Sequence, residues 1–182
     1  MFPLFSKLFL LIIILVGSNH LSYGQNLLLE IKGKPISGNM MSLPQDSPTN
    51  TFIIVVGFSR EAGEKMGAWQ IKLMDAVEAS ANISNELTVY QIPIVGPVWD
   101  LIRGFIEGGI KNSMSEKYHP YLMISYQDPK PFITALNIMD KSDPYVFLVA
   151  HTGEIKGRYN GEVSNEKVEK IMRDYVRETH NE

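Results

Sequence analysis

Two charged side chains follow the most β-branched segment of the chain and are the first candidates for a functional site. Arg60 and Glu61 come directly after Phe52–Phe58, at the start of an expected helix. Glu61 suits this place because the helix dipole favours a negative charge near the N-terminus. Such a pair can recognise a peptide, and Arg60 can hold an anionic substrate. The alternative interpretation is an ordinary solvated helix start without a ligand.

Residues for covalent or metal chemistry are scarce. The sequence has no cysteine, which excludes disulfides, thiolate nucleophiles and thiolate metal ligands. His119, His151 and His180 have no second ligand at metal-binding spacing, and His151 fits a turn. The sequence also lacks a nucleophile elbow, a phosphate-binding glycine loop and a His-Glu-x-x-His pattern. We therefore expect no catalytic residue, no metal and no cofactor, and a protein that is not an enzyme.

The first 24 residues have the pattern of a secretory signal peptide. Lys7 precedes the apolar run Leu8–Val16, and Ser22-Tyr23-Gly24 places small residues at positions −3 and −1 of a cleavage site. The run is shorter than the roughly 20 apolar residues of a transmembrane helix, although an uncleaved anchor is the alternative. We expect residues 1–24 to be a signal peptide, residues 25–182 to form one domain, and the protein to be exported, either periplasmic or secreted.

The net charge of the chain limits the classes of partner that it can bind. Removing Lys7 leaves 16 basic residues against 20 acidic ones, a net charge of −4. A mildly acidic chain with scattered Lys and Arg residues has no nucleic-acid-binding signature. Any membrane contact would come through an uncleaved N-terminal segment or a membrane-protein client. The expected partner is a polypeptide.

Strand and helix patterns alternate along the chain, which predicts a layered α/β fold. The expected strands are Leu27–Ile31, Met40–Leu43, Phe52–Phe58, Leu87–Ile94, Tyr121–Tyr126, Tyr145–Ala150 and Glu154–Tyr159. Turns are expected at 33–35 and 151–153, and a loop at 44–50. The expected helices begin near Glu61, cover Val98–Met114, and follow Asp128 and Ser164. Apolar residues form one stripe along the first helix at Ala62, Met66, Trp69, Leu73, Val77 and Ala81.

The stretch from Pro144 to Tyr159 is the most informative segment. A proline opens its first strand, at the place where a strand tolerates a missing N–H. Val146–Val149 has no polar residue, which is typical of a strand covered on both faces. A turn at 151–153 then leads into a returning strand.

This stretch is similar to a hairpin of the thioredoxin-like fold. The order Pro-x-x-Phe-Leu-Val-x-x-x-Gly-x-Ile at 144–155 resembles the extracytoplasmic thiol–disulfide and peroxiredoxin-like branches, with Ala150 where aspartate is usual. Gly33–Leu43 looks like the hairpin that these branches place before their first central strand, and Phe52–Phe58 looks like that strand. The resemblance implies an α/β, three-layer thioredoxin-like sandwich with an N-terminal β-hairpin and a helix–strand insertion.

The same resemblance implies roles for particular residues. Pro144 corresponds to the family's cis-proline, which faces the catalytic cysteines and pairs with extended substrate backbone. The Cys-x-x-Cys pair would lie at roughly Gly63-Glu64-Lys65-Met66, where this chain has no cysteine. Disulfide exchange is impossible because no thiolate exists to attack or to leave.

A narrower resemblance accounts for the missing cysteines. Phe58-Ser-Arg-Glu-x(7)-Trp69, Ala135-Leu-Asn-Ile and Tyr145-Val-Phe-Leu-Val look like the mitochondrial ATP-synthase assembly-factor family. Members of that family are thioredoxin-fold chaperones of the proton-channel subunit and do not depend on cysteine. From this resemblance we keep a non-redox thioredoxin fold that holds a partner, and we do not keep the named client.

These observations lead to one predicted site. The predicted partner-binding residues are Arg60, Glu61, Met66, Pro144 and Tyr145. A polypeptide would bind there by strand-like backbone pairing and apolar contacts, in an assembly or chaperone-like role. Two alternatives remain open, which are a cysteine-independent enzyme that uses the same pocket and a structural domain with no ligand at that face. An exposed apolar patch around Met66 and Pro144 would favour the binding module.

Overall fold

The computed structural model describes residues 26–80 and 83–179 of the chain. The expected signal peptide, Ala81 of the predicted stripe and His180 lie outside the described residues. The strands are β1 (Ile31–Pro35), β2 (Met41–Leu43), β3 (Thr51–Gly57), β4 (Leu87–Pro93), β5 (Met123–Ile124), β6 (Tyr145–Ala150) and β7 (Ile155–Asn160). The helices are α2 (Arg60–Glu78), α3 (Arg103–Ser113), α4 (Pro129–Ala135) and α5 (Asn165–Thr179), with 3₁₀ helices η1 (Pro97–Ile102) and η2 (Glu116–Tyr121).

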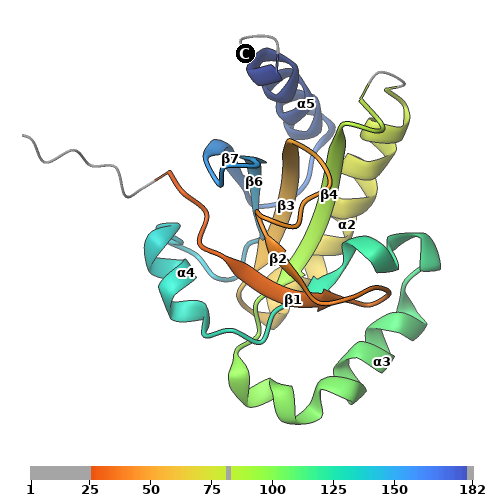
Figure 1. The fold of residues 1–182 in the computed structure, drawn as a ribbon, viewed down its shortest axis with the longest axis vertical. Helices are drawn as coiled ribbons and strands as arrows, with labels where there is room; N and C mark the ends of the chain where they lie inside the picture. Colours follow the sequence, from red (N-terminus) through yellow and green to blue (C-terminus); the bar gives the residue numbers. More distant parts are fainter. Residues whose placement is uncertain (1–25, 81–82, 180–182) are drawn as a thin grey trace, which may run out of the picture.

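The main sheet has the strand order β4-β3-β6-β7 (Figure 1). β3 is parallel to β4 and antiparallel to β6, and β6 continues antiparallel into β7. The predicted strand Phe52–Phe58 therefore lies inside the sheet, directly beside the first strand of the predicted C-terminal hairpin. Its long apolar run is explained by burial on both faces, because every residue from Phe52 to Gly57 is buried.

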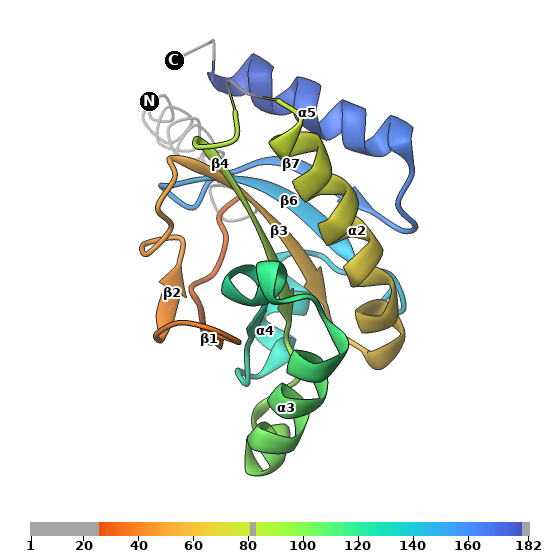
Figure 2. The ribbon, with the colours of Figure 1, turned by 90° about the vertical axis from the view of Figure 1, so that its right-hand side faces the viewer.

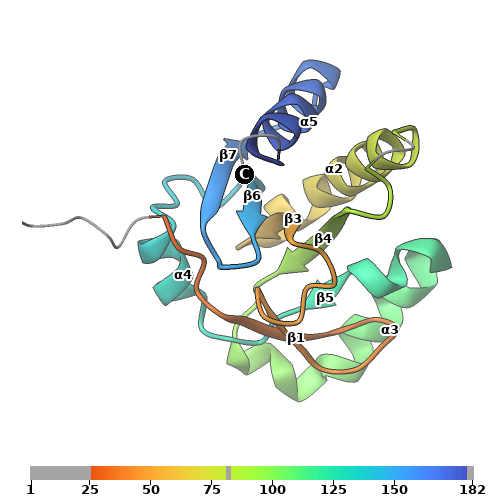
Figure 3. The ribbon, with the colours of Figure 1, turned by 45° about the horizontal axis from the view of Figure 1, so that its top comes forward.

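Helices cover one face of this sheet, while a small sheet and a helix cover the other (Figures 2 and 3). Alternate residues of β3 point to opposite faces, so Ile53 and Val55 pack against α2 and α5. Phe52, Ile54 and Val56 pack on the other side, against β1, β2 and α4. The described chain is therefore a three-layer α/β sandwich, as the sequence predicts.

The N-terminal hairpin is present, but its first strand lies later than predicted. β1 pairs antiparallel with β2 and with β5. It contains Gly33, which we expected in a turn, whereas Leu27 makes only an isolated bridge to Glu154. The glycine belongs in a strand because β5 approaches closely, and a Cβ at Gly33 would lie 2.6 Å from Cγ of Met123.

Helix α2 begins where the sequence predicts. The hydroxyl of Ser59 accepts a hydrogen bond from the backbone N–H of Ala62 at 3.1 Å, which satisfies one free donor at the helix start. The predicted stripe from Ala62 to Val77 faces the core. At its centre, Trp69 is fully buried and its Nε1–H donates to the carbonyl of Gly161 at 2.8 Å.

The insertion after β4 differs most from the prediction. The expected helix Val98–Met114 consists of η1 followed by α3, and neither has a buried residue. The expected strand Tyr121–Tyr126 is reduced to β5, because η2 ends at Tyr121 and pairing with β1 involves only Met123 and Ile124. In Figure 2, α3 lies at the opposite end of the molecule from α5.

The last helix follows the prediction. Asn165–Thr179 forms α5, and the hydroxyl of Ser164 accepts a hydrogen bond from the backbone N–H of Lys167 at 3.2 Å. Within the described residues, no helix is both long and apolar enough to cross a membrane.

Candidate functional site

The predicted polar pair lies on the surface. Arg60 opens α2 with 94% of its side chain exposed, and its Nε lies 3.1 Å from Oε1 of Glu64. Glu61 is also exposed, and its Oε1 lies 3.5 Å from Nζ of Lys65. Each is thus half of an ion pair one helical turn apart, an arrangement that stabilises a helix start by about 0.3–0.5 kcal/mol. Both residues remain accessible to a partner.

The other predicted contact residues are buried. Met66 packs against β3 so tightly that a Cβ on Gly57 would lie 2.5 Å from its sulfur. Pro144 is buried, and its carbonyl accepts a hydrogen bond from the backbone N–H of Gly161. Tyr145 is buried too, and its hydroxyl accepts a hydrogen bond from the backbone N–H of Asp140 at 3.1 Å. None of these side chains forms an exposed apolar patch.

The loop before β6 lies against the start of α2, as the fold requires. Hydrogen bonds between the loop and α2 fill this contact. The hydroxyl of Ser59 donates to the carbonyl of Lys141 at 2.7 Å. The ammonium of Lys65 donates to the carboxylate of Asp143 at 3.0 Å and to the carbonyl of Ser142 at 3.1 Å. The hydrogen bond that Lys65 donates to Asp143 is the main cause that raises the pKa of Lys65. The bond before Pro144 is trans, contrary to the expectation from the resemblance, and the cis peptide of the described chain precedes Pro44.

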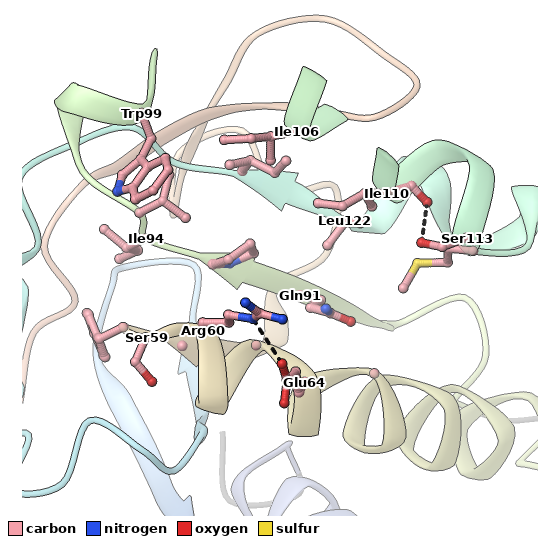
Figure 4. A pocket seen from close by; sticks show the side chains of 18 residues that line it. Ser59, Arg60, Glu64, Gln91, Ile94, Trp99, Ile106, Ile110, Ser113 and Leu122 are labelled. Carbon is pink, nitrogen blue, oxygen red and sulfur yellow. Dashed lines mark hydrogen bonds and ion pairs between the residues drawn. The ribbon is translucent and has the colours of Figure 1, made fainter. Parts of the chain in front are cut away.

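An open pocket of about 550 Å³ lies on the other side of β3, where α2 faces β4 and the insertion (Figure 4). Its volume is within the range of small-ligand sites. Its apolar lining comes from several elements: Phe58, Ile94, Val95, Trp99, Ile106, Ile110, Met114, Leu122 and Ile124. In Figure 4 the side chains of Trp99, Ile106 and Ile110 come from η1 and α3 and face α2 and β4.

Two glycines leave the α2 wall of this pocket bare. Gly63 and Gly67 are one helical turn apart and both line the pocket. A Cβ built on either would meet no other atom within 4 Å. The helix surface between Arg60 and Gly67 is therefore open to a ligand, and a larger side chain at either glycine would occupy the pocket.

The polar groups in the wall are few. Among the lining residues, the ionisable groups are Arg60 and Glu64, which pair with each other. Gln91 comes from β4 and is only 6% exposed, and its Oε1 has no hydrogen-bond partner. In Figure 4, Gln91 lies between α2 and the insertion. Such a wall can bind an apolar group, but it brings no acid and base together around a reacting atom.

A metal centre has no basis in the part of the chain that the structure describes. Residues 26–80 and 83–179 contain no group of three or more His, Asp or Glu side chains placed to hold an ion. His119, one of the candidates in the sequence, is buried, and its Nε2 lies 3.1 Å from the carbonyl of Met114.

The insertion also presents apolar side chains to solvent. Leu101 and Phe105 are 88% and 83% exposed, and Val98 is exposed on the same element. Val98 and Leu101 lie on η1 and Phe105 lies on α3, while Trp99 and Ile106 of the same two helices line the pocket. Two helices, η1 and α3, that carry exposed apolar side chains and have no buried residue are typical of an interaction surface.

Sequence reasoning missed most of this pocket. Gly63-x-x-x-Gly67 beside an apolar stripe could have indicated a bare helix surface. Gln91 also had a signal, because it follows Leu87 and Val89 at alternate positions that face α2 and is the polar member of that series.

Comparisons with known proteins support the fold and give no family. No protein-family model matches the chain, and no curated protein matches its sequence. Solved structures do match. BsSco, a member of the Sco family of cytochrome c oxidase assembly proteins, superposes with a TM-score of 0.55 at 14% identity, covering 82% of this chain and 91% of its own.

Two further solved structures match over most of the chain. The exposed lipoprotein thioredoxin of Streptococcus pneumoniae has a TM-score of 0.54 at 8% identity, covering 80% of this chain and 99% of its own. StoA from Bacillus subtilis has a TM-score of 0.50 at 17% identity, covering 78% and 95%. At these identities the likeness shows the fold alone. The chain has a thioredoxin-like fold, and its sequence contains no cysteine.

Proposed function

We propose that this protein is an exported, redox-inactive thioredoxin-fold protein that binds a polypeptide, in an assembly or chaperone-like role. The observation that carries the proposal is the apolar pocket of about 550 Å³ beside the start of α2. It adjoins the place where the sequence resemblance puts the missing cysteine pair, near Gly63. The proposed site is therefore accessible at this helix start and has no cysteine thiol that could exchange disulfides.

The chemistry of the pocket supports binding over catalysis. Its walls are mostly apolar, its ionisable residues neutralise each other as the Arg60–Glu64 pair, and it is continuous with the half-exposed Trp99. Large apolar side chains of a partner gain most from such a surface, because burial of apolar area is the main driving force of association. The exposed Leu101 and Phe105 on the same insertion extend the surface that a chain could cover.

Export is part of the proposal and rests on the sequence. The apolar run Leu8–Val16 and the small residues before Gln25 support it. One of the solved structures that share the fold is named as an exposed lipoprotein. A kinship with the ATP-synthase assembly factors would give the role a precedent, but the named client of that family is not carried over.

A peptide titration tests the proposed function. ¹⁵N-labelled protein is titrated with short Gly/Ser peptides that carry one Trp, Phe, Leu or Ala. We expect saturable shifts at Gly63, Gly67, Gln91 and the Trp99 indole for the aromatic peptides and none for the Ala peptide.

Two matched variants locate the binding. Gly67→Leu should abolish the shifts because its side chain fills the pocket, and a leucine also favours the helix. Gly109→Ala is the control, since Gly109 does not line the pocket and a Cβ there meets nothing within 4 Å. Peptide binding that survives Gly67→Leu, or the absence of shifts at the pocket residues, contradicts the proposal.

A further inference from the structure

Three apolar side chains of the insertion project into solvent without lining the pocket. Val98, Leu101 and Phe105 are 70%, 88% and 83% exposed, and none of them lines the pocket of about 550 Å³. We call these three residues the insertion tip. Large apolar side chains with so much exposed surface protrude from the molecule, and a group of them marks a contact with a protein or a membrane. The helix α3, which carries Phe105, lies at the opposite end of the molecule from α5 (Figure 2).

A group of positive side chains adjoins the insertion tip. Lys32 and Lys34 on β1 and Arg103 at the start of α3 line a second, smaller pocket of about 180 Å³. None of the residues that line this pocket is acidic. We call the three residues the cation cluster. Because Arg103 is two residues from both Leu101 and Phe105 in the sequence, the cation cluster and the insertion tip are neighbours at the same end of the molecule.

The cation cluster keeps donors and an excess of positive charge. Nζ of Lys32 lies 3.0 Å from Oε2 of Glu30, and a guanidinium nitrogen of Arg103 lies 2.6 Å from Oδ1 of Asp100. Lys34 forms no ion pair with another described residue. Three positive charges therefore face two carboxylates, and each cation has more N–H donors than one carboxylate uses. An anionic group can bind here.

The position of Arg103 is fixed, and the rest of α3 is electrically balanced. Cζ of Arg103 lies 4.5 Å from the ring centroid of Tyr126, a contact that orients the guanidinium. Further along α3, Glu107 and Lys111 carry opposite charges. The positive charge of this end therefore comes from the cation cluster. Guanidinium and ammonium groups together are suited to a phosphate, the first through paired donors and the second as a point charge.

We propose that this end of the protein binds the surface of a lipid bilayer that contains anionic phospholipids. The insertion tip enters between the lipids, and the cation cluster binds a headgroup phosphate. This inference goes beyond the proposed function, because it uses side chains outside the polypeptide pocket. It also differs from the two routes of membrane contact considered from the sequence, which are an uncleaved N-terminal segment and a membrane-protein client.

A bilayer suits this surface better than a folded partner does. Binding at a membrane surface gains from the burial of apolar area and from attraction to anionic lipids, and the insertion tip and the cation cluster supply one each. A folded partner would need a hollow shaped for every protruding side chain, whereas lipid chains rearrange around them. Aromatic side chains such as the half-exposed Trp99 of η1 are favoured at the level of the headgroups.

Vesicle binding tests the proposal on the expected mature protein, residues 25–182. Co-sedimentation is measured with vesicles of phosphatidylcholine alone and of phosphatidylcholine mixed with phosphatidylglycerol. We expect about tenfold tighter binding to the mixed vesicles at low salt, because several cations meet an anionic surface. Tryptophan emission should shift to shorter wavelength on binding. Of the two tryptophans in the chain, Trp69 is fully buried and Trp99 is half exposed, so the shift reports on the insertion.

Surface variants test the insertion tip and the cation cluster separately. The double variant Leu101→Ser and Phe105→Ser should bind mixed vesicles at least about tenfold more weakly, because it removes most of the apolar area that would be buried. Met139→Ser is its matched control, since Met139 is 84% exposed and lies outside the insertion. Lys34→Gln should reduce the preference for mixed vesicles several-fold, whereas Lys141→Gln, at an exposed lysine outside the cation cluster, should not.

The results that overturn the proposal are distinct from those that overturn the proposed function. No binding to mixed vesicles, equal binding to both compositions, or unchanged binding of the double variant overturns it. If vesicles do not bind and the double variant converts a dimer into a monomer in sedimentation velocity, the insertion tip contacts a second copy and the membrane assignment is wrong. Gly67→Leu should leave vesicle binding unchanged, so the peptide titration and the vesicle assay fail independently.

Discussion

Asp174 joins α5 to the edge strand β7. Its carboxylate accepts hydrogen bonds from the hydroxyl of Tyr159 and the ammonium of Lys170, and a guanidinium nitrogen of Arg177 lies 3.3 Å away. Burial alone would raise the pKa of Asp174. The hydrogen bonds from Lys170 and Tyr159 and the two positive charges outweigh burial and hold the pKa below its ordinary value of 3.8.

This arrangement predicts an acid-sensitive contribution to stability. In the unfolded chain Asp174 takes up a proton near pH 3.8, whereas in the folded protein it stays ionised to lower pH. Its stabilising effect is therefore fully present above that pH and is lost as the pH falls through the lower folded-state pKa. In urea unfolding from pH 7 to pH 2.5, Asp174→Asn should reduce this pH dependence, and Tyr159→Phe should reduce it in part. A variant with the same pH dependence as the unmodified protein contradicts the assignment.

Gln70 is a buried amide of α2 whose nitrogen and oxygen both lack a partner. Gln70→Met keeps the volume and removes two unpaired polar atoms, so we expect it to raise the free energy of unfolding by about 1–2 kcal/mol. Gln127→Met is the matched control, because the Gln127 amide accepts from the backbone N–H of Lys32 and donates to the carbonyl of Glu30. That variant should destabilise the protein. The urea unfolding midpoints of both variants and the unmodified protein test the prediction. A lower midpoint for Gln70→Met contradicts it.

At the residue scale, the sequence predicts the cap of α2 and the stripe that faces the sheet, because both depend on local spacing. It does not predict that Tyr145 is buried, since that depends on how closely the loop before β6 approaches α2. Tyr145 on β6 and the pocket beside β4 lie on opposite sides of β3. Gln91 is a polar residue of β4 that lines the pocket. It does so only because η1 and α3 lie opposite it, and their position cannot be read from the sequence.

Helix α3 stands out among the elements because it is the α-helix of the described chain with no buried residue. It also contains Gly104, Gly108 and Gly109, and a Cβ at any of them would meet nothing within 4 Å. Within the described residues, no neighbour packs closely enough to require a glycine at any of these positions. The main effect of these glycines is to weaken the helix, by up to about 1 kcal/mol each relative to alanine.

A single substitution tests this view of α3. Gly109→Ala should stabilise the helix locally and slow amide hydrogen exchange in residues 103–113 several-fold, with little change in the global unfolding midpoint. Gly57→Ala makes the same change in β3, where the new Cβ would lie 2.5 Å from the sulfur of Met66, and should lower the free energy of unfolding by about 1–3 kcal/mol. Unchanged or faster exchange in Gly109→Ala contradicts the account of α3.

Element types were predictable where the pattern was long. The periodicity of α2 and α5 and the apolar runs of β3 and β6 fix those elements, because burial on one or two faces leaves a direct signature. Residues 98–114 carry a helical apolar pattern as well, but periodicity cannot show whether a core covers the apolar face. β1 was displaced because Gly33 and Pro35 signal a turn, and only the pairing of β1 with strands on both sides overrides that signal.

At the scale of the whole molecule, the layered α/β fold can be predicted from the order of the elements along the chain, and the pocket cannot. The order of strands and helices identifies the fold, and the adjacency of β3 and β6 follows from it. The pocket joins Gly67 on α2, Gln91 on β4 and Ile106 on α3, segments far apart in sequence and set by the insertion. Sequence reasoning therefore reached a non-redox thioredoxin fold and an accessible helix start, and it missed the pocket.

The central claim is that this pocket, and not another apolar surface, receives a partner's side chain. The most direct measurement is photo-cross-linking of the purified protein with a Gly/Ser peptide that carries one photoreactive aromatic residue, followed by mass-spectrometric mapping of the adducts. The account predicts adducts on pocket residues such as Trp99 and Ile106, which disappear in Gly67→Leu. Adducts confined to the exposed outer face at Leu101 and Phe105, or unchanged by Gly67→Leu, would contradict it.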